Sequence, residues 1–416
     1  MRYSAAALLR NALSHHRRWP RAWRDPAPRE SYEVVVIGGG GHGLATAYYL
    51  AKEHGITDVA VLEKGWIGGG NTGRNTTVVR ADYLTEEANA FFGLSVRLWE
   101  TLARDLNFNV MFSSRGVLKL AHARQELRAM VRRNNAIRLA GLDSEMVSLA
   151  EIRRLVPIID TGPNARYPII GGVFQRHAGI ARHDAVAWGF ARAADARGVD
   201  IIQNCAVTAI RQSGGRVTGV ETGRGVIAAK KVAFAVAGHS SVLANMLGLR
   251  LPIRTIPLQA FVSEPMKPVL HTVLASAQLL VYVSQSDKGE LVLGGGHERF
   301  PSYAQRGSLS HVEDAVAALV ALIPRFSRVK MMRQWAGIID LTPDDSPIID
   351  RLPVAGAYMD GGWGTGGFKA TPASGLCFAH LIATDRPHPA AAPFALRRFE
   401  SGRLINEHLS AGGYEH

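Results

Sequence analysis

The chain has 416 residues, a mass of 45.0 kDa and an ordinary hydrophobic content of 47%, so it can bury a large core and form two or more domains. It contains no apolar run of the roughly eighteen residues needed to span a membrane, and we expect no membrane association. The net charge of +13 and pI near 10.0 would suit nucleic acid, but the basic residues are spread along the chain without interleaved aromatics. We therefore expect a general preference for anions, or an acidic protein partner, and no nucleic acid.

The two cysteines, Cys205 and Cys377, are predicted to lie in a strand and a helix. They lack the spacing of metal ligands, so we expect two buried thiols and no metal site. This fits a reducing compartment, and we expect the cytoplasm, or the mitochondrion if the source is eukaryotic.

Residues 1–30 form a basic N-terminal arm with no acidic residue before Asp25. Its arginines are Arg2, Arg10, Arg17, Arg18, Arg21 and Arg24. One interpretation is a mitochondrial transit peptide, which is also Arg-rich, amphipathic and poor in acids. The other is an arm that packs on a partner subunit, with residues 19–28 held extended by their prolines. The sequence leaves both open.

The first strand of the main fold is predicted at residues 34–37, followed at once by Gly38, Gly40 and Gly43 in G-x-G-x-x-G spacing. Gly38 permits a tight turn, Gly40 lets a pyrophosphate approach the backbone, and Gly43 lets the following helix pack closely on the strand. The amides at the helix N-terminus then face the phosphates. This pattern predicts a dinucleotide site.

A second apolar strand at residues 59–62 ends in Glu63, about twenty residues after the last glycine. A carboxylate here accepts the ribose hydroxyls and repels a 2′-phosphate, which disfavours NADP. The loop that follows is rich in glycine and carries Asn71, Arg74, Asn75, Thr76 and Thr77. Such donors are typical of the surroundings of a pyrophosphate and a flavin ring, although a plain flexible loop has the same composition.

Apolar periodicity predicts the remaining elements. The predicted helices are 86–106, 125–142, 149–156, 185–197, 312–323 and 376–383, and the predicted strands are 116–120, 169–174, 200–210, 217–222, 231–238, 279–283, 290–294 and 330–339. Asp184 is expected to cap the helix at 185–197, and Gly198 to end it. The strands between 200 and 238 suit a meander over the nucleotide-binding sheet, with Val207 beside an adenine. Residues 251–300 suit a second, antiparallel sheet.

This order of elements resembles flavoproteins of the glutathione-reductase type, which interleave one cofactor domain through the chain. The resemblance predicts an α/β and α+β protein with a Rossmann-like FAD-binding domain and an antiparallel-sheet substrate domain. We expect the FAD-binding domain at 31–115, 175–250 and 340–385, the substrate domain at 116–174 and 251–339, and a basic, surface-exposed C-terminal segment at 386–416.

The segments VAVLEKGWIGGGNTGRNTT, ARHDAVAWGFARAA, TPDDSPIID and GGWGTGGFKATP resemble the beta subunits of heterotetrameric sarcosine oxidases, a branch of the D-amino-acid oxidase-like flavoproteins. The resemblance runs from about residue 31 to the end. It implies noncovalent FAD, and FMN attached covalently to the histidine of ARHDAVAW, which is His183. His177 is a second histidine close by, and we expect it to be incidental. It further implies alpha, gamma and delta partner subunits, with tetrahydrofolate bound on the alpha subunit.

For the reaction, the resemblance implies hydride transfer from sarcosine to FAD, then electron transfer to FMN and oxygen. The products are glycine, hydrogen peroxide, and formaldehyde or 5,10-methylenetetrahydrofolate. Arg80 and Lys369 match the family's carboxylate-binding pair, and an arginine fork suits a carboxylate well. The expected cofactor-binding residues are Gly38, Gly40, Gly41, His42, Gly43, Glu63, Asn71, Arg74, Thr76, Val78, Val207, Gly364, Gly367 and Lys369, with His183 for FMN.

Three alternatives remain at this point. The chain could act on another N-methyl amino acid, a D-amino acid or proline, and acidic residues after Arg80 depart from the family's pattern. It could be a non-catalytic interaction subunit that has lost its cofactor. A nicotinamide-dependent dehydrogenase would leave GWGTGGFK without a role.

Overall fold

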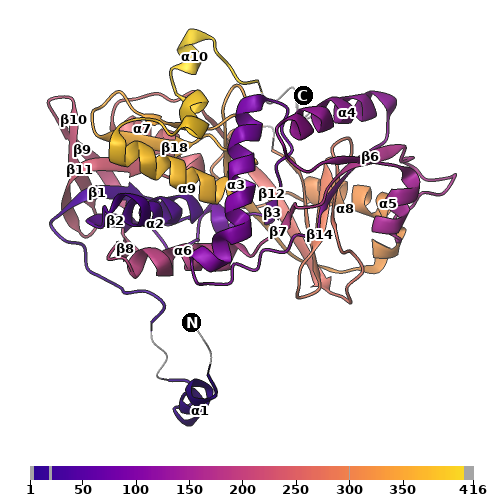
Figure 1. Cartoon of the computed structure of the whole chain (residues 1–416), viewed down its shortest axis with the longest axis horizontal. Helices are drawn as coiled ribbons and strands as arrows, with labels where there is room; N and C mark the ends of the chain where they lie inside the picture. Colours follow the sequence, from indigo (N-terminus) through magenta and orange to yellow (C-terminus); the bar gives the residue numbers. More distant parts are fainter. Residues whose placement is uncertain (1–3, 18–20, 299, 407–416) are drawn as a thin grey trace.

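Two eight-stranded sheets organise the computed structural model, which describes residues 4–17, 21–298 and 300–406 (Figure 1). The first sheet has, in spatial order, β17 (Ile348–Arg351), β18 (Ala357–Gly361), β11 (Gly225–Phe234), β1 (Ser31–Ile37), β2 (Val59–Leu62) and β8 (Asp200–Ile202). From β18 to β8 the strands are parallel, and the antiparallel strands β10 (Arg216–Thr222) and β9 (Val207–Ser213) extend from β11. A parallel sheet whose central strand ends in the four buried apolar residues 34–37 needs cover on both faces.

Helices cover one face of this sheet, and the meander covers the other. The helices are α2 (Gly41–His54), α3 (Glu86–Asp105), α6 (His183–Asp195) and α9 (Gly367–Thr384). Val34 and Val36 of β1 point into the helical core, whereas Val35 and Ile37 point into a second core with β9, β10 and α7 (Ser240–Met246). The period-two alternation of a strand thus divides one apolar run between two cores.

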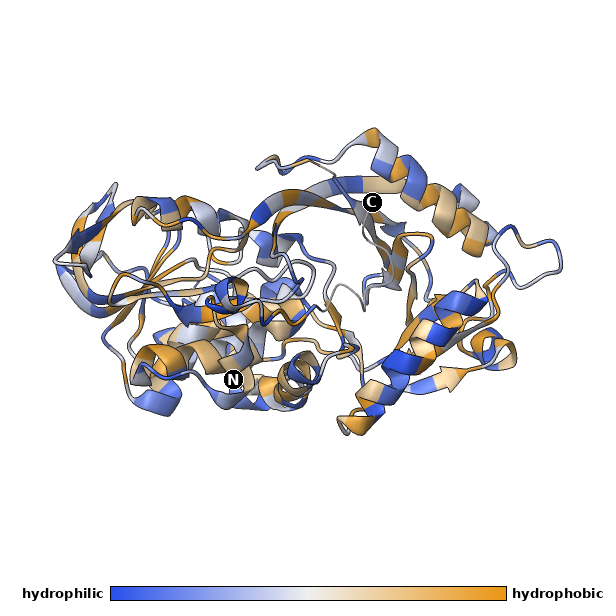
Figure 2. Cartoon of the chain, turned by 90° about the horizontal axis from the view of Figure 1, so that it is seen from above, coloured by the Kyte–Doolittle hydropathy of each residue, from blue (hydrophilic) through white to orange (hydrophobic). Residues whose placement is uncertain are grey.

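The second sheet is antiparallel except for one pair. Its order is β16 (Met331–Leu341), β12 (Arg254–Pro265), β15 (Glu290–His297), β14 (Val281–Gln285), β13 (Val273–Ser276), β4 (Val117–Ala121), β6 (Gly171–Gln175) and β5 (Glu145–Val147). Helices α4 (Arg124–Leu139), α5 (Leu149–Leu155) and α8 (Leu309–Leu322) pack on it. In Figure 2 these outer helices carry both hydrophilic and hydrophobic residues, as layers that bury one side do.

Short elements complete the described chain. The pair β3 (Val78–Val79) and β7 (Gly179–Ile180) forms a separate two-stranded ribbon. The remaining helices are α1 (Ala5–Leu13), α10 (Arg398–Ser401) and the 3-10 turns η1 (Asn71–Arg74), η2 (Ala237–His239), η3 (Pro324–Arg328) and η4 (Pro389–Phe394). No helix among the described residues is long and apolar enough to cross a bilayer.

Several predicted bounds are wrong. Helix α9 begins at Gly367, nine residues before the predicted start, and two strands precede it where none were predicted. The predicted strand at 200–210 is two strands, β8 and β9, separated at Asn204, whose φ of +51° breaks the extended backbone. Cys205 therefore lies in this link, although the prediction that both cysteines are buried free thiols is confirmed.

The predictions for the start of α6 and for the C-terminal segment are also wrong. Helix α6 begins at His183, and its N-cap is Arg182, so Asp184 lies in the first turn and its carboxylate accepts from the Ala185 amide at 2.8 Å. The C-terminal segment is not wholly on the surface, because Arg398 is buried and pairs with buried Asp344 at 2.8 Å. The last part of that segment, 407–416, and residues 1–3 and 18–20 of the arm lie outside the described residues.

Candidate functional site

A large cavity, about 2570 Å³, lies between the two sheets and is lined by residues of both. Ligand pockets commonly measure about 300–1,000 Å³, so this one has room for more than a small substrate. Most of the predicted residues line it: Gly38, Gly40, Gly41, His42, Glu63, Asn71, Arg74, Thr76, Val78, Arg80, Val207, Gly364, Gly367 and Lys369. Gly43 and His183 do not.

The glycine turn between β1 and α2 has no room for side chains. Gly38 has a φ of +115°, and a Cβ there would lie 2.3 Å from the Ala235 carbonyl oxygen. A Cβ on Gly43 would lie 1.9 Å from the Gly38 carbonyl oxygen, so Gly43 acts by letting α2 approach the turn. The backbone of the turn is therefore open to a ligand at the helix N-terminus, as a pyrophosphate requires.

Glu63 lies directly after β2, where its carboxylate is held by two backbone amides. Gly39 donates to Oε2 and Gly65 donates to Oε1, both at 2.8 Å. Each carboxylate oxygen keeps a free lone pair for a ribose hydroxyl. The cradle of glycines with this fixed acceptor fits a dinucleotide with an unphosphorylated ribose.

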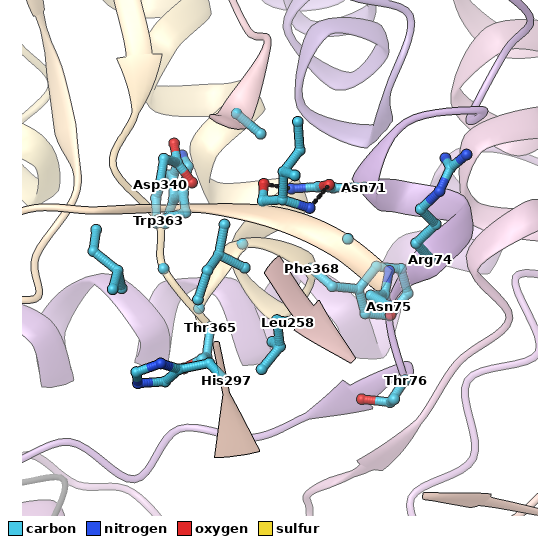
Figure 3. A pocket seen from close by; sticks show the side chains of 18 of the residues that line it. Asn71, Arg74, Asn75, Thr76, Leu258, His297, Asp340, Trp363, Thr365 and Phe368 are labelled. Atoms are coloured by element: carbon cyan, nitrogen blue, oxygen red, sulfur yellow. Dashed lines mark hydrogen bonds between the residues drawn. The ribbon is translucent and has the colours of Figure 1, made fainter. Parts of the chain in front are cut away.

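The loop after Glu63 is tied to the second sheet. The Asn71 side chain donates to the Ile338 carbonyl at 2.5 Å and accepts from the Ile338 amide at 3.0 Å, as the dashed lines in Figure 3 show. Thr76 donates to the Tyr282 hydroxyl at 3.0 Å, and Arg74 donates to the carbonyls of Gly69 and Gly70. These three predicted cofactor residues thus also fix the position of the loop.

His42, in the first turn of α2, joins that helix to α9. Its Nδ1 lies 2.9 Å from Asp360 Oδ2, and its Nε2 lies 2.7 Å from the Gly367 carbonyl oxygen. Burial opposes protonation, but Asp360 and the Gly367 carbonyl outweigh it and raise the pKa of His42. Because both ring nitrogens face acceptors, the imidazolium satisfies the site best. The protonated ring thus forms a buried ion pair with Asp360 at the wall of the cavity.

Three basic side chains and one carboxylate meet on the far side of the cavity. Asp82 is buried and forms ion pairs with both Arg80, after β3, and Lys119, on β4. Lys369, in the first turn of α9, is also buried, and its Nζ donates to the Thr365 carbonyl at 3.0 Å. In the described part of the chain no carboxylate pairs with Lys369. This corner therefore carries excess positive charge and suits a carboxylate ligand.

The position of Lys369 is fixed by its backbone. Its carbonyl accepts from Ser95 Oγ at 2.6 Å and from Trp99 Nε1 at 2.9 Å, both on α3. Burial lowers the pKa of Lys369 well below its usual range, and the charges of Arg80 and Lys119 lower it further. A bound carboxylate would oppose all three effects and favour the ammonium form.

Asp340, at the end of β16, lies near the GWGTGG turn, close to Trp363 in Figure 3. It accepts from the Gly362 amide at 2.5 Å. Burial raises its pKa to about 7, although amides of Gly362 and Trp363 and the charge of His42 act in the opposite direction. This carboxyl lines the cavity, and it changes its protonation state near neutral pH.

His183 lies apart from the cavity, at the first position of α6. Its side chain is partly buried, and its Nδ1 is buried without a hydrogen-bond partner. Burial lowers its pKa, so the imidazole is neutral at physiological pH and keeps a nucleophilic nitrogen. An orphaned ring nitrogen fits a covalently attached group. His177, by contrast, is exposed, with Glu100 3.9 Å from its Nδ1.

Sequence reasoning missed Asp82, Lys119 and Asp340. Asp82 had a signal, because the acids after Arg80 were the departure from the family's pattern. Lys119 had no such signal in the sequence, because the alternation of a strand does not distinguish a lysine that faces a cavity from one that faces solvent. Asp340 lies in an apolar strand end, where only the fold reveals its burial.

Comparisons with known proteins agree with this geometry. Residues 33–381 match the family model described as "FAD dependent oxidoreductase". The chain is 56% identical to a sarcosine oxidase subunit beta of Rhizobium meliloti (98% of both chains) and 52% identical to one of Rhodobacter capsulatus (99% of both). The solved L-proline dehydrogenase from P. horikoshii superposes with a TM-score of 0.84 at 27% identity, covering 91% of this chain and all of that one.

Two per cent of 416 residues is about eight, so both bacterial matches include most of residues 1–30.

Proposed function

The chain belongs to the sarcosine oxidase beta subunits, within the FAD-dependent oxidoreductases, and from this premise we propose that it holds FAD and oxidises sarcosine in a multisubunit complex. The observation that carries the proposal is one cavity lined both by the dinucleotide cradle of Gly38 and Glu63 and by the basic side chains of Arg80 and Lys369. The FAD-binding half takes the interleaved, glutathione-reductase-type arrangement.

Each residue group has its own task in the mechanism. FAD, when bound, supplies the hydride acceptor. Arg80 and Lys369 hold the substrate carboxylate, and this orients the amine and its methyl group inside the cavity. Asp82, which also pairs with Lys119, holds the Arg80 side chain, and the His42 imidazolium holds the Gly367 carbonyl at the start of α9.

Lys369 also moves a proton. Burial and the charges of Arg80 and Lys119 lower its pKa, and this favours release of its own proton before the substrate binds. The amine then accepts the proton of the incoming secondary ammonium, so the substrate nitrogen becomes neutral while the lysine gains the charge that pairs with the carboxylate. Electron donation from the substrate requires this neutral nitrogen. When product leaves, the buried lysine releases its proton.

The remaining features come from the family. FMN is attached covalently to His183, outside the cavity, and alpha, gamma and delta subunits complete a heterotetramer with tetrahydrofolate on alpha. Electrons end on oxygen to give hydrogen peroxide, and the products are glycine and formaldehyde or 5,10-methylenetetrahydrofolate. The neutral, orphaned Nδ1 of His183 supports the FMN assignment.

The test of the function is anaerobic addition of sarcosine to the assembled complex, with flavin absorbance as the readout. We expect bleaching with sarcosine, and weaker responses to proline and D-amino acids. Reduction by proline alone would assign the chain to the alternative substrate class, and no reduction by any amine would favour a non-catalytic subunit.

The covalent site has a separate test. We expect acid-denatured protein to retain one flavin, His183→Ala to release it, and His177→Ala, the matched control, to retain it. Equal retention in both variants would show that His183 is not the attachment site.

A further inference from the structure

Helix α1, at the N-terminus, buries none of its nine residues. Ser4 caps it by accepting from the Ala7 amide at 3.1 Å, yet Leu8, Leu9 and Leu13 are 56%, 63% and 75% exposed. Figure 1 shows α1 clear of the two-sheet body. Isolated helices shorter than about twelve residues are marginal in water, so a helix of this length needs a surface to pack on.

The three leucines of α1 lie on one side. Leu9 and Leu13 are four residues apart, Ala5 precedes Leu9 by the same interval, and Leu8 lies beside them. This spacing is the one by which short helices insert anchors into a groove. The arm is basic, with Arg10 on α1 and Arg17 after it and no acid before Asp25. A groove that fits this helix is apolar with an acidic rim.

The segment between α1 and β1 is fastened to the body. Arg24 pairs with Asp195 at 2.8 Å and donates to the Val199 carbonyl at 2.8 Å. Arg29 pairs with Asp58 at 2.8 Å and with Asp200 at 3.1 Å. The arm is therefore anchored next to the edge strand β8, while the helix ahead of it contributes nothing to the core of its own chain.

We propose that α1 docks into an apolar, acid-rimmed groove on another subunit of the complex. This inference rests on the proposed function only in that the chain has partner subunits. The arm is shared with the two bacterial relatives, both named as subunits, and this favours docking over a mitochondrial transit peptide. A membrane surface is the competing occupant, but the apolar side of α1 lacks the tryptophan or phenylalanine typical of interfacial helices.

The test uses the complex assembled by co-expressing this chain with its partner subunits. We expect the amides of residues 5–13 to exchange hydrogen at least about tenfold more slowly in the complex than in the free chain. Leu9→Glu with Leu13→Glu should abolish this protection and raise the dissociation constant of the complex about tenfold or more. The matched control is Leu139→Glu with Leu309→Glu, two leucines of the body that are 89% and 70% exposed, and it should assemble as wild type.

Unchanged exchange in the complex, or normal assembly of the α1 variant, would overturn the proposal. So would flotation of the chain with vesicles of phosphatidylcholine and phosphatidylglycerol that depends on Leu9 and Leu13 while assembly does not. Anaerobic reduction by sarcosine is measured on the same wild-type complex. A complex that protects α1 but is not reduced would refute the function and leave the docking intact.

Discussion

At the scale of single residues, the corner of the cavity formed by Arg80, Asp82, Lys119 and Lys369 determines how ligand binding depends on pH. Lys369 has a lowered pKa in the free protein, and a carboxylate ligand restores its charge, so ligand binding takes up a proton. We expect the dissociation constant of acetate, which brings no ammonium proton, to rise up to about tenfold per pH unit above the free-protein pKa. Lys369→Met should bind acetate more weakly and without this slope, whereas Lys288→Met, an exposed control, should match wild type. Calorimetric titrations between pH 6 and 9 measure the dissociation constant of acetate for each protein.

Asp82 is the counter-charge of the same corner. Its replacement by Asn removes the carboxylate that pairs with both Arg80 and Lys119 in a mostly buried site, and we expect a loss of roughly 3 kcal/mol in the free energy of unfolding. Asp287→Asn removes an exposed pair with Arg115 and should cost under about 1 kcal/mol. Urea titrations measure the free energies of unfolding of both variants and the wild type. Acetate should stabilise Asp82→Asn more than wild type, and equal stabilisation would mean that the corner does not bind carboxylates.

At the scale of elements, the contact between α2 and α9 places both His42 and Lys369. Gly375 of α9 packs against Ala45 of α2 so closely that a Cβ there would lie 2.4 Å from the Ala45 Cβ. We expect Gly375→Ala to separate the helices, lower the free energy of unfolding by about 1–3 kcal/mol and raise the KM for sarcosine. Gly223→Ala, in an open turn, should change neither. A KM unchanged in a destabilised Gly375→Ala protein would show that the helix spacing does not position Lys369.

The same elements show what the sequence could predict. Residues 59–62 and 86–106 were placed nearly to the residue, because short apolar runs and amphipathic periods are local signals. Helix α9 was placed nine residues late because glycines and Pro372 are unfavourable in helices, and the packing on α2 and α3 that overrides this is tertiary. The glycine fingerprint and Glu63 were readable for the same local reason. Asp82 and Lys119 were not, because ion pairs between elements have no sequence period.

At the scale of the whole molecule, buried Asp340 makes stability depend on pH. Its folded pKa of about 7 lies above the unfolded value of about 3.9, so its stabilising contribution is present below about pH 4 and is lost as pH rises through 7. We expect the difference in unfolding free energy between wild type and Asp340→Asn to fall by up to about 1.4 kcal/mol per pH unit across that window and to level off above it. Urea unfolding from pH 5 to 9 measures it, and a flat difference would show that Asp340 is ionised throughout.

The tie between Asn71 and β16 has a consequence for redesign. The cofactor cradle belongs to the first sheet and its helices, whereas Lys119 and much of the cavity wall come from the second sheet, and the loop bonded to Ile338 holds the two in register. Substitutions confined to β4 and β13–β15 can therefore alter which amine is accepted, while the residues of the cofactor cradle stay unchanged. A directed-evolution library should begin on those strands and leave Asn71 fixed.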